Sequence, residues 1–265
     1  MNKTELLDKY ARDGESRLLL ARVLDQQQRA DQRDIPTHTA FLSPAEQAMS
    51  ADLLMAAAPG QGVLHGGYAD AERKLWGFLP DWLDEDLWLA GEDCPLAALE
   101  VKTPKGAKLT HRDYLGSLMG LGITREKIGD ILIGETGAQV IVLRETLPIL
   151  LAQWEKAGRY PVTLTPLPLD QLTPTPGETK EVRATVASVR LDAVVSAGFS
   201  IPRSRAADLI RGGRVMVNHR PCEKADKVVE AGDVLTCRGL GKCVLTEIGG
   251  TSKRGRTILT IQRYL

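Results

Sequence analysis

A proline-containing segment, residues 171–180, divides the chain into two parts whose net charges have opposite signs. It reads Gln-Leu-Thr-Pro-Thr-Pro-Gly-Glu-Thr-Lys, and its prolines, its glycine and its lack of apolar periodicity predict a semi-extended linker. Residues 1–178 hold 18 Lys+Arg against 26 Asp+Glu, a net charge of −8, whereas residues 179–265 hold 16 against 8, a net charge of +8. We therefore expect an acidic body joined to a basic module that favours a polyanionic partner.

The composition argues against a membrane protein and against a metalloprotein. No run approaches the roughly 20 consecutive apolar residues of a membrane span, and the charged N-terminus lacks the apolar core of a signal peptide, so we expect a cytoplasmic protein with no membrane partner. The cysteines form no Cys-x-x-Cys pair, and only His219 lies near Cys237 and Cys243. We expect buried, reduced thiols, no metal, no cofactor and a monomer, and DNA is not an expected partner.

The acidic body is expected to begin with a helical segment, residues 1–58. Apolar residues keep helical spacing in two stretches, and a third helix opens with Ser43-Pro44-Ala45-Glu46. Serine can cap the first free amides of a helix, proline suits its first position, and the glutamate can reach back to the cap. Pro59-Gly60-Gln61-Gly62 then breaks the helix.

Residues 59–170 alternate between strand and helix patterns, which predicts a ferredoxin-like α+β sandwich of the RNA-recognition-motif type. We expect strands near 63–64, 74–79, 96–101, 128–134, 138–143 and 160–164, and helices near 110–121 and 144–157. The strands lack the aromatic residues that stack bases in RNA-recognition motifs, so protein contact or a structural role is favoured over independent RNA binding. Trp82 and Trp88, beside four carboxylates, fit either the core or a partner surface.

The basic module, residues 181–265, is expected to open with two short helices. Apolar residues between 191 and 195 keep helical spacing, and Gly198 can end the first helix. Ser200 can cap the second helix, and Gly212-Gly213 can stop it.

Cations of this module lie where a phosphate could be bound. Arg203 and Arg205 fall in the first turns of the second helix, where free amides and the helix dipole also favour an anion. Strict alternation over 214–218 predicts a strand whose valines face the core. Arg238-Gly239-Leu240-Gly241-Lys242 places two cations around glycines that let the backbone approach a phosphate closely, and the last hairpin has a basic turn at 253–256.

Six short motifs keep a consistent spacing in the basic module. They are Arg190-Leu191-Asp192, Arg203-Ser204-x-Ala206, Leu209-Ile210, Gly212, Val215-x-Val217-Asn218 and Gly232-Asp233-x-Leu235. Together they resemble the RNA-binding domain of ribosomal small-subunit protein S4, called the S4 domain below, in which two helices and a small twisted sheet grip structured RNA. With this resemblance, RNA contacts are expected at Arg190, Arg203, Ser204, Arg205, Arg211, Arg214, Arg238, Lys242 and Arg254. The usual Asn-Gly turn of that family is Asn218-His219 here, so a different turn type is expected.

A second set of motifs lies in the acidic body. They are Phe41-Leu42-x-Pro44-x-Glu46, Gly66-Gly67-Tyr68-x-x-Ala71-Glu72-Arg73, Thr110-His111-Arg112-Asp113-Tyr114-Leu115-Gly116, Leu121-Gly122-Ile123 and Arg125-Glu126-Lys127-Ile128-Gly129-Asp130. These residues resemble the bacterial YlmH family, in which an RNA-recognition-motif-like fold precedes the S4 domain. The resemblance implies a non-enzymatic RNA-binding protein of translation quality control. Its expected partners are rRNA, with tRNA as a further one, on large ribosomal subunits obstructed by peptidyl-tRNA.

Three short motifs mimic those of enzymes. His111-Arg112-Asp113 spells the protein-kinase triplet but lacks the asparagine five positions after the aspartate, so a helix cap is the favoured role. Arg190-Leu191-Asp192 mimics the pseudouridine synthase tripeptide but lies inside the S4 pattern, where Asp192 is expected to pair with arginines or cap a helix. Gly134-Glu135-Thr136-Gly137 has the wrong spacing for a methyltransferase. The alternative function is an rRNA-modifying enzyme, of methyltransferase or pseudouridine synthase type, directed to rRNA by its S4 domain.

Overall fold

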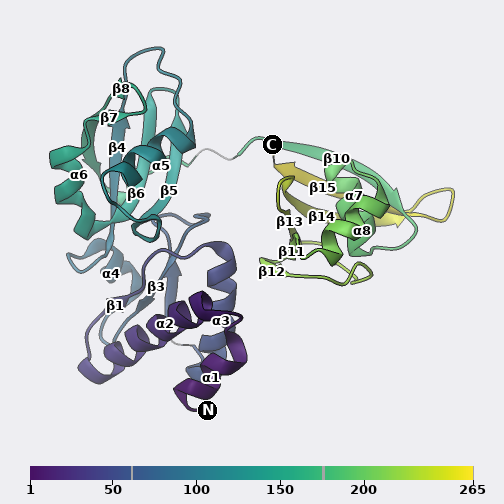
Figure 1. Ribbon diagram of the computed structural model, residues 1–265, viewed down its shortest axis with the longest axis horizontal. Helices are drawn as coiled ribbons and strands as arrows, with labels where there is room; N and C mark the ends of the chain where they lie inside the picture. Colours follow the sequence, from purple (N-terminus) through teal and green to yellow (C-terminus); the bar gives the residue numbers. More distant parts are fainter. Residues whose placement is uncertain (61, 175–176, 265) are drawn as a thin grey trace. The chain divides into compact units, whose positions relative to one another are not determined.

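The computed structural model describes residues 1–60, 62–174 and 177–264 (Figure 1). The chain divides into two compact units, Met1–Thr175 and Pro176–Leu265, and each combines helices with sheets, which confirms the α+β class. The division falls within the segment expected to be a linker, of which residues 175 and 176 lie outside the described part. Gln61, in the expected helix break, also lies outside it.

Helices α1 (Lys3–Tyr10), α2 (Gly14–Arg33) and α3 (Pro44–Ala57) open the first unit. The expected cap at the start of α3 is confirmed. Ser43 Oγ accepts the amide of Glu46 at 3.4 Å, and the Glu46 carboxylate accepts the amide of Ser43 at 2.6 Å. Leucines from all three helices, including Leu7, Leu20 and Leu53, are buried in one cluster that holds these helices together.

A small antiparallel sheet accompanies these helices, with the strand order β1-β3-β2. Its strands are β1 (Thr37–His38), β2 (Val63–His65) and β3 (Leu75–Phe78), and the short helix α4 (Glu85–Ala90) follows them. Strands from both sides of residue 58 therefore share one sheet, so a domain limit at that residue would cut through it. The limits of the domains stay a prediction.

A four-stranded sheet in the order β5-β6-β4-β9 completes the first unit. Its strands are β4 (Leu96–Lys102), β5 (Ile128–Gly134), β6 (Gly137–Leu143) and β9 (Thr163–Leu167). Helices α5 (His111–Gly120) and α6 (Leu147–Gln153) contribute Tyr114, Leu118 and Leu150 to the buried cluster on one face, together with Val101 and Val140 of the sheet. Two helices on one face of an antiparallel sheet agree with the expected sandwich.

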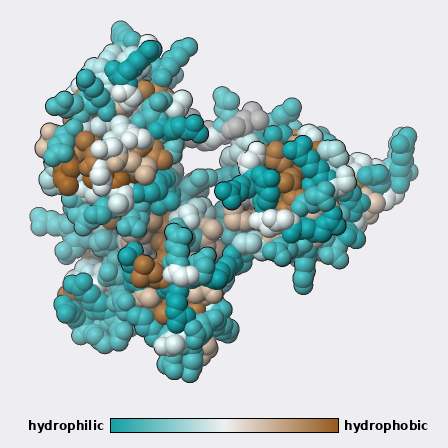
Figure 2. All heavy atoms as spheres, in the orientation of Figure 1, coloured by the Kyte–Doolittle hydropathy of each residue, from teal (hydrophilic) through white to brown (hydrophobic). Residues whose placement is uncertain are grey.

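Helix α6 is shorter than the helix expected over 144–157. It follows the 3-10 turn η2 (Arg144–Thr146), and the chain leaves the helix at Trp154, whose ring is buried in the core at 3% exposure. On its outer side α6 leaves Ile149 and Leu151 exposed, and Figure 2 shows the apolar patch over this helix.

The strand expected at 160–164 is split in two. Strand β8 (Tyr160–Pro161) turns back to pair with β7 (Lys156–Ala157), and only β9 joins the large sheet, beside β4. The short connecting turns η1 (Arg125–Lys127) and η3 (Leu169–Gln171) carry no counterpart among the expected elements. The run expected to be one strand therefore contributes to two strands with different partners, and periodicity alone does not distinguish the two cases.

The second face of the large sheet is not free along its full length. Leu96, Ile141 and Leu143 lie in one buried cluster with Phe41 and Trp88 from the N-terminal part. In RNA-recognition motifs the sheet face stacks bases on exposed aromatic rings. Here that end of the face is already filled by the protein's own side chains, so it has no room for a base.

The second unit is built on a six-stranded antiparallel sheet in the order β10-β15-β14-β13-β11-β12. Its elements are β10 (Thr179–Val186), α7 (Leu191–Phe199), α8 (Arg203–Arg211), β11 (Val215–Val217), β12 (Arg220–Pro221), β13 (Val234–Cys237), β14 (Gly241–Thr251) and β15 (Thr257–Tyr264). The expected alternation holds, because Val215 and Val217 are buried against α7 and α8 in the core of this unit.

The predicted ends of both helices in this unit are confirmed to within one residue, since α7 ends at Phe199 and α8 at Arg211 with Gly212 as its cap, but the predicted start of α8 is wrong. At Gly198, in the last turn of α7, an added Cβ would lie 2.9 Å from the Cys243 sulfur, so this glycine also allows helix and sheet to approach closely. Ser200 does not cap α8. It has φ 56° and follows the last residue of α7, and Pro202 precedes the first residue of α8.

The expected change of turn type between β11 and β12 is also wrong. Asn218 and His219 both have positive φ, 49° and 64°, as a type I′ turn requires. Asn218 is fixed by its side chain, because Nδ2 donates to Asp233 at 2.7 Å and Oδ1 accepts the amide of Val234 at 2.9 Å. These bonds tie the turn to the loop before β13.

The cysteines are free thiols, as expected, but they are not all buried. Cys94, Cys237 and Cys243 are buried, whereas Cys222 is half-buried. Burial raises the pKa of all three buried thiols, that of Cys243 to about 12. Within the described ranges, no group of three His, Cys, Asp or Glu side chains could hold a metal ion, and no helix is long and apolar enough to span a bilayer.

We expect one fast-reacting thiol in the native protein at neutral pH, that of Cys222. The other three should react only after unfolding, because burial both shields them and disfavours the thiolate. Titration with an aromatic disulfide reagent counts the reactive thiols in the native protein and again after guanidinium has unfolded it. Two or more fast thiols in the native protein would contradict the burial of this set.

Candidate nucleic-acid interface

Asp192 holds two of the predicted RNA-binding arginines. Its carboxylate lies in the first turn of α7 and accepts two hydrogen bonds from Arg203, from Nε at 3.0 Å and from Nη2 at 3.1 Å. Arg190 Nε lies 3.7 Å from the same carboxylate. The Asp192 side chain is 10% exposed and that of Arg203 is 52% exposed. The bonds to Asp192 raise the pKa of Arg203, and the expected pairing of Asp192 with arginines is confirmed.

Arg190 is placed at the edge of this ion pair. It precedes α7 directly, and its Nε is buried without a hydrogen-bond partner, although the side chain as a whole is 41% exposed. A guanidinium has five N–H donors, and a buried one without a partner is costly. The Arg190 and Arg203 side chains are 41% and 52% exposed, so both keep N–H donors that a phosphate could reach.

A second group consists of Arg205, Arg214 and Arg238. Strands β11 and β13 place the last two side by side, since Arg238 N donates to Arg214 O at 2.9 Å and Arg214 Nη2 donates to Arg238 O at 3.1 Å. Arg205 lies on α8, and its charge, like that of Arg214, opposes the rise that burial causes in the pKa of Cys237. Among the described residues none of the three has a salt bridge. The group therefore carries three uncompensated charges.

Gly239 lets the backbone beside this group stay open. It follows Arg238 with φ 88°, a conformation that favours glycine, and an added Cβ would lie 3.4 Å from Arg214 Nη2. The Arg214 guanidinium thus lies close to the backbone at Gly239.

The remaining predicted residues are more dispersed. Ser204 is exposed on α8, and Arg211 at the end of that helix pairs with Asp208 at 2.6 Å, which partly neutralises it. Lys242, at the start of β14, lies over the Tyr264 ring at 4.3 Å. Arg254 follows the other end of β14, in a turn that Figure 1 shows projecting beyond the helices of this unit. The structure does not bring Lys242 and Arg254 together.

Arg203→Ala and Arg205→Ala are expected to differ in their effect on stability. Both should weaken binding of structured RNA by about ten-fold, the size of one charge-assisted hydrogen bond. Only Arg203→Ala should also lower the melting temperature, because it leaves Asp192 without its two-bond partner. Thermal denaturation and fluorescence anisotropy on the same preparations separate the two effects. Equal melting temperatures for both variants would mean that the Asp192 pair has no structural role.

The acidic body contains a polar network that the sequence did not predict. The Asp130 carboxylate accepts hydrogen bonds from Tyr68 Oη at 2.9 Å and from the amides of Glu72 and Arg73 at 2.7 and 3.1 Å. The Arg73 guanidinium in turn donates to the carbonyl of Phe41 at 3.0 Å. Three of the separate YlmH-like motifs thus meet in one place, where they join the N-terminal part to the large sheet.

The kinase-like triplet has a structural role. The Asp113 carboxylate accepts the amide and the hydroxyl of Thr110, both at 2.7 Å, and so caps α5. These bonds lower the pKa of Asp113. The expected cap is confirmed for Asp113.

Three family models match the chain. Residues 15–77 match the model described as "YlmH, N-terminal", residues 90–171 match "Putative RNA-binding domain in YlmH", and residues 189–235 match "S4 domain". The S4 match contains Asp192 and the Arg205–Arg214 part of the basic group, and it ends before Arg238.

The chain is also similar to individual proteins. It is 36% identical over 231 residues to "Ribosome-associated protein quality control protein P2" of Bacillus subtilis (strain 168), a match that covers 85% of this chain and 86% of the relative. Among solved structures, "Cell division protein ylmH from Streptococcus pneumoniae" is 24% identical with a TM-score of 0.49, over 61% of this chain and 96% of that one.

Proposed function

The chain belongs to the YlmH family, and from this premise we propose that it is a non-enzymatic factor that binds rRNA, and tRNA held there, on obstructed large ribosomal subunits. The observation that carries the proposal is the group of Arg205, Arg214 and Arg238, three cations without a salt bridge among the described residues. Cations on a rigid scaffold that are not neutralised by the protein itself are suited to the phosphates of structured RNA.

The name of the Bacillus subtilis relative supports the choice of partner. That protein is named as ribosome-associated and as part of protein quality control. We carry this role over to the present chain, with peptidyl-tRNA on the large subunit as the obstruction that it senses. A factor that works on ribosomes acts in the cytoplasm.

The geometry of Asp192 speaks against the alternative, an rRNA-modifying enzyme of the pseudouridine synthase type. A nucleophilic carboxylate needs access to its substrate. Asp192 is 7% exposed, is bound by Arg203 through two hydrogen bonds, and also accepts the amide of Ala193 at 2.8 Å. Its lone pairs are committed to holding the domain, which supports the binding role.

Two attachments explain how the protein would prefer obstructed subunits. The basic unit binds rRNA, and the connecting segment keeps the acidic unit at a high effective concentration near a second site. The binding free energies of the two sites then combine only on subunits where both sites are present. In this proposal the presence of tRNA creates or exposes the second site.

We expect the full-length protein to co-sediment with large subunits and to prefer those that carry peptidyl-tRNA over empty ones. Pelleting through a sucrose cushion with both kinds of subunit measures the preference. The matched control is the double variant Arg205→Ala/Arg214→Ala, which should lose binding to loaded and to empty subunits alike. That result would identify the basic unit as the part that holds the protein on the subunit. Equal pelleting with loaded and empty subunits would rule out the quality-control role and leave general rRNA binding.

A further inference from the structure

The middle of the acidic body has an unusual run of charge. Residues 75–101 contain seven aspartates and glutamates and no lysine or arginine. Most of these carboxylates surround α4 (Glu85–Ala90), which lies between the small sheet and the large one in the sequence. A surface of this kind repels RNA, so its partner must be sought elsewhere.

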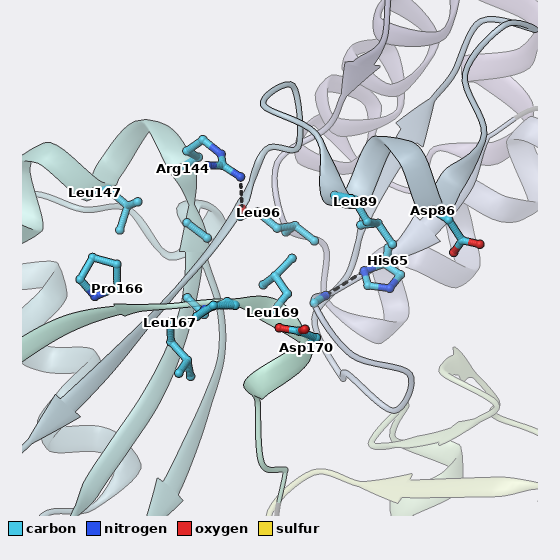
Figure 3. A pocket seen from close by; sticks show the side chains of 15 residues that line it. His65, Asp86, Leu89, Leu96, Arg144, Leu147, Pro166, Leu167, Leu169 and Asp170 are labelled. Carbon is cyan, nitrogen blue, oxygen red and sulfur yellow. Dashed lines mark hydrogen bonds between the residues drawn. The ribbon is translucent and has the colours of Figure 1, made fainter.

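Two cavities flank α4. The first has a volume of about 740 Å³ and an apolar lining to which Leu89, Leu96 and Leu169 contribute, with the carboxylates of Asp86 and Asp170 at its side. Figure 3 shows that the side chains around it come from β2, α4, the start of β4, the η2–α6 segment, and β9 with the residues that follow it. Its size is that of a ligand-binding cleft, and its floor suits aliphatic side chains.

The second cavity is lined by residues at the start of α4 and is acidic. It has a volume of about 520 Å³, and five carboxylates line it. They belong to Asp31, Asp34, Asp81, Asp84 and Glu85. No lysine, arginine or histidine is among the residues that line this cavity, so its charges are not compensated locally.

The basic groups that line the first cavity do not neutralise it. The Arg144 guanidinium donates to the carbonyls of Cys94 and Leu96 at 2.7 and 3.3 Å, which fixes it on the backbone. His65 Nδ1 accepts the amide of Gly67 at 3.0 Å, and burial lowers the pKa of this ring, which disfavours its charged form. In the part of the chain that the structure describes, neither lining aspartate has a salt bridge.

Exposed apolar side chains accompany the carboxylates. Of the two tryptophans for which the sequence left core and surface open, Trp88 is buried at 1% exposure and Trp82 is 59% exposed. Leu87 on α4 is 61% exposed. An exposed indole ring beside carboxylates attracts cations through its π face.

We propose that the two cavities and the exposed side chains of residues 81–87 form a docking groove for an extended, lysine- and arginine-rich protein segment with interspersed aliphatic residues. Cationic heads would pair with the carboxylates on both sides of α4, and aliphatic side chains would pack on the partly exposed Leu89 and Leu169. Because carboxylates and apolar side chains lie together on this surface, it favours a basic protein segment over RNA. The proposal goes beyond the proposed function and does not depend on it, because no RNA takes part.

The test uses the full-length protein and a short fluorescent peptide of alternating lysine and leucine. Wild-type protein should bind it, and Glu85→Gln/Asp86→Asn should bind it about five-fold more weakly, since two ion pairs at a partly exposed groove are lost. The matched control, Glu135→Gln/Glu155→Gln, removes the same charge from exposed positions outside both cavities and should leave the affinity unchanged. Trp82→Ala should weaken binding, and the far-UV circular dichroism of all variants should match.

Three results would overturn the proposal. The first is an equal loss of affinity in the two double variants, which would mean attraction by net charge alone. The second is equal binding of a peptide in which glutamate replaces lysine, or no binding of the lysine peptide at all. The third is a change in RNA affinity in Glu85→Gln/Asp86→Asn with unchanged peptide affinity, which would make this surface an RNA contact. None of these results bears on whether the S4 domain binds RNA, so the two claims fail separately.

Discussion

Replacing Arg205, Arg214 and Arg238 together with alanine is expected to weaken binding of structured rRNA by roughly 100- to 1,000-fold, because each charge-assisted contact with a phosphate contributes about 1.5–3 kcal/mol and such terms are not fully additive. The fold should survive the change. All three side chains are exposed, and among the described residues none of them has a salt bridge whose loss would strand a carboxylate. Fluorescence anisotropy with a folded rRNA fragment gives the affinity, and thermal denaturation checks the fold.

The matched control removes the same number of charges from the acidic body. Arg22, Arg29 and Arg33 are exposed on α2 and, like the first set, have no salt bridge in the described part of the chain. Their replacement with alanine should change RNA affinity less than about three-fold, an effect of net charge screened by salt. Equal losses in the two triple variants would show that binding follows total charge and not a site.

The second large effect is expected from dividing the chain. The isolated segment 179–265 should fold and keep RNA affinity within about ten-fold of the full chain, whereas segment 1–174 should bind at least roughly 100-fold more weakly. The net charges of +8 and −8 on the two sides of residue 179 are the physical reason. The separate core of the second unit, from Val186 to Ile261, supports independent folding.

Binding assays on both segments under one buffer condition test this expectation. Circular dichroism must first show that each segment is folded, so that weak RNA binding cannot be attributed to an unfolded segment. Comparable RNA affinity of the two segments would place a second RNA site in the acidic body and contradict the division of roles.

Much of the fold could be predicted because local signals agreed with the final packing. Ser43-Pro44-Ala45-Glu46 carries all the chemistry of a helix start, and the structure places the helix there. The alternation around Val215 and Val217 likewise places the correct face in the core. Such elements depend on neighbours within a few residues, so the sequence contains the information in one place.

The wrong turn type was predicted where a distant contact decides the local structure. His219 suggested a new turn type, but the side chain of Asn218 bonds to the loop before β13 and keeps positive φ at both residues. Asp233 and Val234 are not near Asn218 in sequence, and no local pattern reveals these bonds.

The candidate site was predicted as a set of residue types, not as a geometry. The motifs indicated arginines at the right positions, and the structure divides them by role, since Arg203 is bound to Asp192 whereas Arg205, Arg214 and Arg238 are not paired with acids in the described residues. The groove proposed around α4 could not be predicted from the sequence, because Asp31, Asp86 and Asp170 come from distant segments and no periodicity connects them.

The central claim is that Arg205, Arg214 and Arg238 bind RNA phosphates, and the salt dependence of RNA affinity tests it most directly. Each phosphate contact releases condensed counterions, so the log–log slope of affinity against salt counts contacts. We expect a slope on the order of −3 to −5 for the wild-type protein and a slope shallower by about two to three in the triple alanine variant, at roughly 0.7–0.9 for each phosphate. An unchanged slope in that variant, even with reduced affinity, would contradict the claim, because the three arginines would then act on RNA binding without touching phosphate.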